Sequence, residues 1–525
     1  MNRRGFLEFL GRTSAVGLAA SQFSLPAWAA RLYVPRFHGI APSSADELIV
    51  APGLTTQTLI QWDQALDALG QLKFGFNNDF TAFFPLTSRP DQGVLWVNHE
   101  YANALFIHGN QDPKTKTRAQ VDAEMKSVGG SLVHIQRFQS QWHVVHDSPY
   151  NRRLDAFTPI PLQWFEPIDG QTMAQGTLAN CAGGVTPWGT VLSCEENYQS
   201  AFGEYVYENG TRRREFGAYV EGWHQYYSRS PEAYGWVTEI NPFTGQAKKL
   251  VGLGRFAHEG ATPVRAPDGR CVVYMGDDAA GECIYKFISH STDSLNEGEL
   301  FVADTFSGRW LSLDLRKNRK LEQDFRSQTE IQIRTRHAAR LVGGTPQDRP
   351  EDIKIDPLTG NVIVALTNNK KTGNAYGSLL KIEEENGDPR AERFQASVFL
   401  TGGSESGFSC PDNLVFDAKG NLFITSDISS GSLGKGEYAK FKNNGLFVVP
   451  ASGPQRGEVI QIASAPVEAE LTGPSFSSDG STLFLSVQHP GEESKSREEL
   501  TSHWPNGGES IPRPAVVAIS GFSQD

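Results

Sequence analysis

The stretch Pro267-Asp268-Gly269-Arg270-Cys271-Val272-Val273-Tyr274, followed by Gly276-Asp277-Asp278, carries the pattern that decides the fold. An Asp-Gly turn precedes a short apolar run, and acidic residues stand where that run ends. Glycine supplies the positive φ that a tight turn requires, and β-branched and aromatic residues favour a strand. The stretch therefore predicts a turn and a strand that delivers carboxylates at its end.

The same order of turn, strand and polar end occurs five more times. The ranges are 89–100, 186–197, 356–369, 417–427 and 478–489. Six unequal repeats indicate an all-β propeller with four-stranded blades and large loop or helical insertions. Their irregular spacing leaves five to seven blades open, and a two-domain β protein is the alternative. In a propeller the corresponding strand ends converge on one end of the central channel, so distant carboxylates would form one metal site.

The composition narrows the class of protein and of partner. The chain has 525 residues, 39% of them hydrophobic, and a net charge of -12. These values are typical of a soluble globular protein, and the acidic balance argues against nucleic acid as the main partner. An acidic protein can still bind an anionic substrate if bound cations neutralise its carboxylates. No P-loop, G-x-S-x-G, H-E-x-x-H or CxxC motif is present, and an odd count of five cysteines leaves at least one unpaired.

The N-terminus predicts export. Asn2-Arg3-Arg4-Gly5-Phe6-Leu7 precedes a mild apolar stretch, and Ala27-Trp28-Ala29 has a small-x-small cleavage pattern. This resembles a twin-arginine signal over residues 1–29, and an ordinary Sec signal is the alternative. We therefore expect a periplasmic or secreted mature protein of residues 30–525, folded as a single propeller domain, with the twin-arginine export machinery as a partner. The apolar stretch is too short to span a membrane.

The most unusual segment is 180–197, which begins Asn180-Cys181-Ala182-Gly183-Gly184 and ends Cys194-Glu195-Glu196-Asn197. It resembles the signature of the PhoX-type alkaline phosphatases, and further landmarks follow in the expected order. These are residues 74–79, 258–260, 276–278, 349–351, 411–413 and 488–492. The resemblance spans about residue 45 to about residue 495, and as a set these motifs are specific.

The resemblance implies a six-bladed propeller that holds ferric iron and calcium in an oxo-bridged cluster. It also implies phosphomonoester hydrolysis, with some activity on diesters, by a metal-bound oxide or hydroxide. Asn180 and Arg349 would hold the phosphate. The implied metal ligands are Cys181, Glu196, Glu259, Glu351 and Asp412, with Asp278 as a calcium ligand. The register within Glu195-Glu196 is uncertain by one residue.

General chemistry agrees with this ligand set. Ca²⁺ and Fe³⁺ prefer carboxylate oxygens, and a single thiolate such as that of Cys181 suits iron better than calcium. Two bridged metals can bind a phosphoryl group between them. The fixed guanidinium fork of Arg349 matches the geometry of a phosphate.

Each assignment has a structural alternative. Cys181 is otherwise a buried apolar residue, Glu195-Glu196 a solvated pair, and Asp412 a turn cap. Glu259 could pair with Arg255, and Arg349 with Glu351 or Asp352. Asp277-Asp278 is equally compatible with a turn. His99, Glu100 and His489 are candidate extra ligands, but core positions are favoured for the two histidines.

One departure from the family pattern concerns Cys410, which stands where we expect a basic residue that helps to hold phosphate. Two other functions compete with the phosphatase: a calcium-dependent lactonase or esterase, and a propeller that only binds a partner. A lactonase has no need of Cys181, whereas an iron cluster does. Because a closed propeller needs no partner to satisfy its sheet edges, we expect a monomer.

Overall fold

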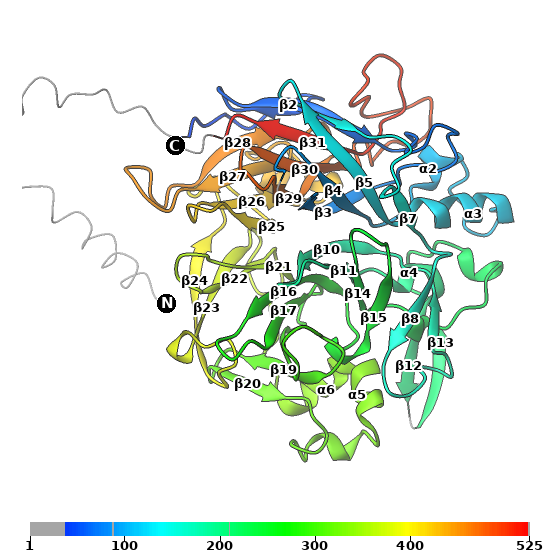
Figure 1. Ribbon diagram of the computed structural model, residues 1–525, viewed down its shortest axis with the longest axis vertical. Helices are drawn as coiled ribbons and strands as arrows, with labels where there is room; N and C mark the ends of the chain where they lie inside the picture. Colours follow the sequence, from blue (N-terminus) through cyan, green and yellow to red (C-terminus); the bar gives the residue numbers. More distant parts are fainter. Residues whose placement is uncertain (1–36, 87–88, 209, 523–525) are drawn as a thin grey trace, which may run out of the picture. The chain divides into compact units, whose positions relative to one another are not determined.

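The computed structural model describes residues 37–86, 89–208 and 210–522, and the predicted signal peptide lies outside them. These residues form a β-propeller of six sheets arranged around one channel (Figure 1). The prediction of an all-β, six-bladed propeller is therefore confirmed, and the two-domain alternative is wrong. Each of the six turns found in the sequence joins the innermost strand of a blade to its second strand.

The first three blades follow one another along the chain. Blade 1 contains β3 (Asn78–Pro85), β4 (Gln92–His99), β5 (Gly129–Phe138), β6 (Gln141–Val144) and β7 (Arg152–Leu154). Blade 2 contains β10 (Asn180–Val185), β11 (Val191–Glu195), β14 (Val237–Ile240) and β15 (Ala247–Leu250), extended by β8 (Pro159–Gln163) and β9 (Met173–Gln175). Blade 3 contains β16 (His258–Arg265), β17 (Cys271–Asp277), β18 (Ile284–Ser289), β19 (Gly298–Asp304) and β20 (Arg309–Ser312).

The other three blades bring the chain back to its beginning. Blade 4 contains β21 (Pro350–Ile355), β22 (Val362–Leu366), β23 (Ser378–Glu384) and β24 (Phe394–Thr401). Blade 5 contains β25 (Pro411–Phe416), β26 (Leu422–Ser426), β27 (Gly445–Val449) and β28 (Ile460–Ser464), with β1 (Ile49–Val50) at its edge. Blade 6 contains β29 (Glu470–Phe476), β30 (Thr482–Gln488) and β31 (Ala515–Ser520), completed by β2 (Thr55–Gln61).

Blade 6 closes the ring with strands from both ends of the described chain. β2 pairs antiparallel with β31, from Thr55 opposite Ser520 to Gln61 opposite Ala515. β1 adds to blade 5 in the same way, since Ile49 lies opposite Ser464. The ring is therefore closed by strand pairing inside blade 6 as well as by packing between blades.

The innermost strands lie against one another around the channel, in the order β3, β10, β16, β21, β25 and β29, with β29 returning to β3. Two glycines allow this close approach. A Cβ at Gly184 would collide with the carbonyl oxygen of Ala261 in the next blade, and one at Gly473 with the carbonyl oxygen of Asp79. Neighbouring inner strands can therefore approach this closely only because these two positions lack a side chain.

The hydrophobic core lies between neighbouring blades, so strands are buried on both faces. In β17, Val272 and Tyr274 pack toward blade 4 with Val364, while Val273 and Met275 pack with residues of blade 2. Successive side chains of a strand point to opposite faces, which explains this division. A fully buried side chain of this size contributes about 1.5–3 kcal/mol.

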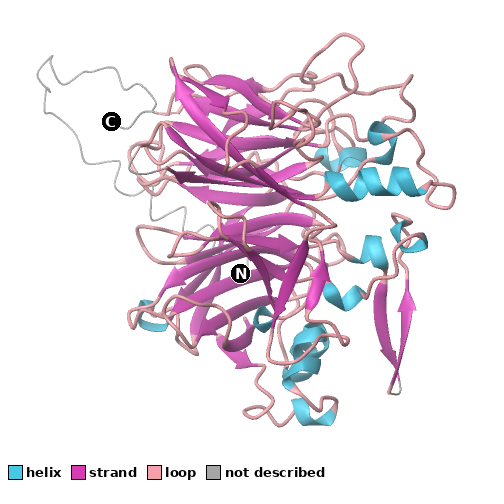
Figure 2. Ribbon diagram, turned by 45° about the vertical axis from the view of Figure 1, so that its right-hand side comes forward, coloured by secondary structure: helices cyan, strands magenta, loops and turns pink. Residues whose placement is uncertain are grey.

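Helices occur in the connections outside the sheets (Figure 2). They are α2 (Ala104–Ile107), α3 (Arg118–Ser127), α4 (Gln199–Phe202), α5 (Gln328–Ile333) and α6 (Thr335–Val342). Short 3₁₀ turns are η1 (Trp223–Gln225), η2 (Pro231–Ala233), η3 (Val251–Leu253), η4 (Leu321–Gln323), η5 (Glu385–Gly387), η6 (Ser430–Ser432) and η7 (Gly436–Tyr438). A separate hairpin is formed by β12 (Glu204–Glu208) and β13 (Thr211–Glu215). In the described part of the chain no helix is long and apolar enough to cross a membrane.

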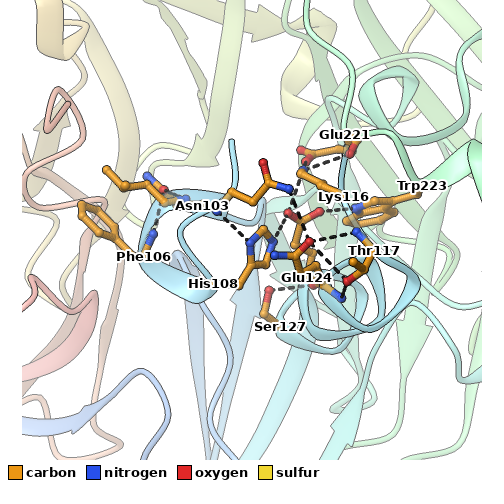
Figure 3. Close-up of polar contacts among 12 residues, drawn as sticks. Asn103, Phe106, His108, Lys116, Thr117, Glu124, Ser127, Glu221 and Trp223 are labelled. Atoms are coloured by element: carbon orange, nitrogen blue, oxygen red, sulfur yellow. Dashed lines mark hydrogen bonds and ion pairs between the residues drawn. The ribbon is translucent and has the colours of Figure 1, made fainter. Parts of the chain in front are cut away.

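Two insertions are joined by a buried polar cluster, which we call the Glu124 clamp (Figure 3). Glu124, on α3, accepts from His108 Nε2 at 2.8 Å and from Trp223 Nε1 at 2.7 Å, and it pairs with Lys116 Nζ at 2.7 Å. Lys116 Nζ also donates to the backbone oxygen of Glu221 at 3.0 Å. The clamp thus ties the connection after β4 to the connection after β11.

Candidate metal centre

The site begins with a bulge that recurs in the innermost strands. In five blades the first residue of the innermost strand pairs with the second strand, the next two residues have no partner, and pairing then resumes. The first unpaired residues are Asp79, Cys181, Glu259, Glu351 and Asp412. A bulge re-aims its side chain, and here it turns these residues into the channel. In blade 6 the bulge falls at Gly473, and Glu470 supplies the carboxylate.

A second set of side chains comes from the residue that directly follows the second strand of a blade. These residues are Glu100, Glu196, Asp278, Asp427 and His489. Because all the inner hairpins run in the same direction relative to the channel, their strand ends meet at one mouth. The strand-end clusters predicted from the sequence therefore do converge.

The two sets line one cavity of approximately 200 Å³. Within it, three groups could each hold a cation, since the ligand atoms of each group lie within 4.8 Å of one another. The groups are Asp79, Glu100 and Cys181; Cys181, Glu196 and Glu259; and Glu259, Glu351 and Asp412. Cys181 and Glu259 each belong to two groups, so the groups form a connected series. Such sharing suits neighbouring metal ions that have ligands in common.

The cavity concentrates negative charge. Its lining contains ten carboxylates: Asp79, Glu100, Glu196, Glu259, Asp278, Glu351, Asp412, Asp427, Glu470 and Glu492. Arg349 and His489 are the basic side chains in the described lining. Burial raises the pKa of Asp79 to about 6, and burial together with the charge of Asp79 raises that of Glu100 to about 8. Without bound cations, these carboxyl groups would therefore bind protons more readily than ordinary carboxyl groups do.

The remaining ligand candidates show the same effect more strongly. Burial and neighbouring carboxylates raise the pKa of Glu196, Glu259, Glu351 and Asp412 well above the ordinary range of carboxyl groups. Burial, with Asp79 and Glu259 close by, likewise raises the pKa of the Cys181 thiol. Sγ of Cys181 lies 3.3 Å from an oxygen of each of these two carboxylates. A thiolate in this position needs a cation beside it.

Arg349 lies at the wall of the cavity. Its Nη2 is 2.6 Å from Oδ2 of Asp278 and 3.0 Å from Oε1 of Glu351. Both salt-bridge partners hold the guanidinium at the cavity, and the side chain keeps 28% of its exposure. Asp352, the other partner considered, pairs with Lys354 instead. Arg349 can therefore reach an anion in the cavity without leaving its carboxylates.

The histidines and Arg255 take different places. His99 is a core residue, hydrogen-bonded to Ser131 and to the backbone of Phe76. His489 lines the cavity, and although burial opposes it, the charges of nearby carboxylates raise its pKa above the ordinary value. Arg255 pairs with Glu204 at 2.9 Å, so Glu259 is left to the cavity.

Adjacent glutamates have opposite surroundings in blade 2. Glu196 lines the cavity, whereas Glu195 lies inside the blade and pairs with the fully buried Lys249 at 2.7 Å. The alternation of a strand sends consecutive side chains to opposite sides. Of the two glutamates that the sequence left open, Glu196 is therefore the one that faces the cavity.

Two sequence assignments have a different setting from the one expected. Asn180 is not among the residues that line the cavity, because its amide nitrogen donates to Thr177 and Ser193 at 2.8 Å inside the blade. Asn197 and Gln488 are the side-chain amides in the described lining of the cavity. Cys410 also lies away from the described lining, packed with Tyr438 and Phe441. A basic residue at position 410 would therefore have to reach the cavity from that apolar cluster.

The ligand set taken from the sequence left out five lining carboxylates; Glu100 was considered only as an extra ligand, and Glu492 lies in the noted segment 488–492. Glu100 and Asp427 stand at strand ends and could have been chosen by the same criterion as Glu196. Asp79 lies in a motif that was noticed, but its bulge is visible only in the structure. Glu470 follows no turn signal, so its position could not be foreseen.

Comparison with known proteins agrees with this site. The model of the family described as alkaline phosphatase PhoX matches residues 35–491. The structure is similar to that of Pseudomonas fluorescens PhoX in complex with vanadate, a transition state analogue. The TM-score is 0.82 with 29% identity, over 93% of this chain and 98% of that chain.

A gluconolactonase from Xanthomonas campestris is far less similar, with 10% identity over 92% of this chain and 98% of that chain; its TM-score of 0.36 carries no argument. No curated protein matches the sequence significantly. The family match covers most of the sequence, and the acidic cavity contains three residue groups that could hold metal ions. The chain therefore belongs to the alkaline phosphatase PhoX family and is a metal-dependent phosphatase.

Proposed function

We propose that the mature protein hydrolyses phosphomonoesters, and some diesters, outside the cytoplasm with a cluster of ferric iron and calcium in the channel cavity. The three connected ligand groups, with one cysteine among carboxylates, are the observation that carries this proposal. Carboxylates suit both ions, and the thiol of Cys181 suits iron. A calcium lactonase would have no use for Cys181.

The residues present fit such a cluster. Oδ2 of Asp412 and Oδ1 of Asp278 are buried and have no hydrogen-bond partner in the described protein. Unsatisfied buried carboxylate oxygens are costly, and a bound cation would satisfy them. Cys181, Glu196, Glu259, Glu351 and Asp412 would hold the metals, and Asp79, Glu100 and Glu470 extend this set.

When bound, the cations would supply Lewis-acid chemistry, polarising the phosphoryl oxygens and lowering the pKa of a bound water. The chain itself orients the substrate. Arg349 offers N–H donors to a phosphate while Asp278 and Glu351 fix its guanidinium. A phosphate between the cations and Arg349 would be held on opposite sides, which positions the ester for displacement.

Export by the twin-arginine route remains part of the proposal, because residues 1–29 lie outside the described structure. That route carries folded proteins, which suits a centre that assembles only when all the blades are in place. A monomer is sufficient for this function, since the described chain supplies the whole ligand set.

The test is hydrolysis of p-nitrophenyl phosphate by the exported protein, with iron quantified in the same sample. The assay is run as isolated, after calcium chelation and after calcium is added back. We expect activity that disappears with the chelator and returns with calcium, in protein that contains iron. Metal-replete protein that leaves the ester intact would refute the proposal.

A further inference from the structure

A second cavity, of approximately 260 Å³, lies outside the metal cavity. We call it the arginine pocket, and its characteristic residues are Tyr198, Tyr205, Tyr207, Arg334, Arg336 and Arg340. Arg334 directly precedes α6, Arg336 lies in its first turn and Arg340 in its last turn. The tyrosines come from the segment after β11 and from β12. In a chain with a net charge of -12, this concentration of guanidinium groups needs a reason.

The arginine pocket is next to the metal cavity. Tyr198 lines the pocket, and the preceding residue, Asn197, lines the metal cavity. On another side, Arg336 donates two hydrogen bonds, at 2.9 and 2.5 Å, to the carboxylate of Asp277, whose neighbour Asp278 lines the metal cavity. The segment 196–198 therefore borders both cavities, and Asp277 links Arg336 of the pocket to Asp278 of the metal cavity.

Most of the charge in the pocket is compensated, but one arginine is not. Arg336 pairs with Asp277, and Arg340 pairs with Glu282 at 2.6 Å. Arg334 has no acidic partner and no side-chain hydrogen bond within the described residues 37–86, 89–208 and 210–522. The pocket thus keeps a positive charge with N–H donors available.

The guanidinium of Arg334 is nevertheless held in place. Its central carbon lies 4.8 Å from the ring centre of Tyr207 and 4.9 Å from that of Phe325. Contact with aromatic faces orients the planar group while leaving its edge donors open. A fork that is fixed in this way loses little entropy when it binds a planar or tetrahedral oxyanion.

We propose that the arginine pocket binds a second phosphate group of the substrate, on the leaving-group side of the ester that is held in the metal cavity. This inference rests on the proposed function and names its substrate class: phosphomonoesters whose leaving group carries another phosphate. The metal cavity itself is lined by carboxylates, so a second anion is repelled there unless it reaches these arginines. Arg334 binds that anion, and Arg336 and Arg340 frame it.

The test compares fructose 1,6-bisphosphate with fructose 6-phosphate, which differ by one phosphate. The ratio of their kcat/KM values is measured for the wild type, for Arg334→Gln and for the control Arg213→Gln. Arg213 is an exposed arginine of β13 that does not belong to the pocket. We expect Arg334→Gln to lower the ratio about tenfold, as the loss of one hydrogen bond to a charged group predicts. The control should keep the wild-type ratio.

A ratio that Arg334→Gln leaves unchanged, or that Arg213→Gln lowers equally, would overturn the inference. Failure of the proposed function is distinguishable, because then neither ester is hydrolysed by any variant. In that event, calorimetric binding of the two sugars decides. Tighter binding of the bisphosphate that Arg334→Gln abolishes supports the pocket, and equal binding of both sugars by the wild type rules it out.

Discussion

The Glu124 clamp and the channel cavity both bury carboxylates, but they differ in whether the protein itself balances the negative charge. In the clamp, Glu124 receives Lys116, His108 and Trp223, so its charge is matched by the protein itself (Figure 3). In the cavity, ten carboxylates face Arg349 and His489. A compensated carboxylate stabilises the fold, whereas an uncompensated group of them marks a place for cations.

The largest effect should come from removing a shared ligand. Glu259→Gln takes a carboxylate from two of the three ligand groups, so we expect loss of bound metal and a fall in kcat/KM of about 100-fold or more. Metal analysis and p-nitrophenyl phosphate hydrolysis measure both. Glu124→Gln is the matched control, a buried glutamate outside the cavity that should keep its metal. Full metal content in Glu259→Gln would contradict the assignment.

Breaking the clamp should instead cost stability. Lys116→Met leaves the fully buried Glu124 without its lysine, and we expect a loss of about 3–5 kcal/mol in the free energy of unfolding. Chemical denaturation measures it, with metal content per folded molecule as the second readout. The double variant Lys116→Met, Glu124→Gln should recover part of the loss. If metal is lost in proportion to stability, the two regions are not independent.

The stability of the metal-free protein should fall as the pH rises, because its cavity carboxyl groups have raised pKa values. Asp79 and Glu100 have folded pKa values of about 6 and about 8, above their ordinary values of 3.8 and 4.5. The folded state then binds more protons than the unfolded state, so its stability falls as the pH rises through this window. A shift of two pKa units corresponds to about 3 kcal/mol.

Thermal unfolding between about pH 4.5 and about pH 8.5, with and without metal, measures this effect. Bound cations should remove most of the slope, because they replace the protons. Metal-free protein that becomes more stable over this range would show that the cavity carboxylates do not titrate as described.

The smallest effect should come from Arg349→Lys, which keeps the charge and loses the fork. We expect kcat/KM to fall about tenfold while metal content stays unchanged, because a lysine makes a single-point contact with phosphate. The same substitution at Arg316, an exposed arginine paired with Asp314, is the control. Equal kinetics for wild type and Arg349→Lys would remove Arg349 from phosphate binding.

The sequence predicted the architecture well because the second strands carry a local signal. Each Asp-Gly or related turn precedes an apolar run, and Asp268-Gly269 before β17 is a clear case. These short-range patterns require no knowledge of distant contacts. The local pattern is therefore sufficient to place the strand-end residues that follow it, such as Glu196 and Asp278, at the channel.

The first-strand ligands were harder to predict from physics alone. Whether Glu259 or Asp412 faces the channel depends on a two-residue bulge, and a bulge reverses the side that strand alternation would give. Resemblance to a family supplied these residues, and it also suggested Asn180, whose amide is engaged inside blade 2. That Asp79 and Glu470 face the channel can be seen only in the assembled ring of blades.

The pairing of β2 with β31 has a consequence for how the protein is made. The strand that completes blade 6 is synthesised early, but its partner, β31, is synthesised after the innermost strands of all six blades. Until then β29 and its Glu470 have no finished blade behind them, and the channel is open on one side. Metal ions can thus be fully enclosed only after β31 has been synthesised and has paired with β2. A shorter fragment would contain every ligand of the three groups and still leave the channel open on one side.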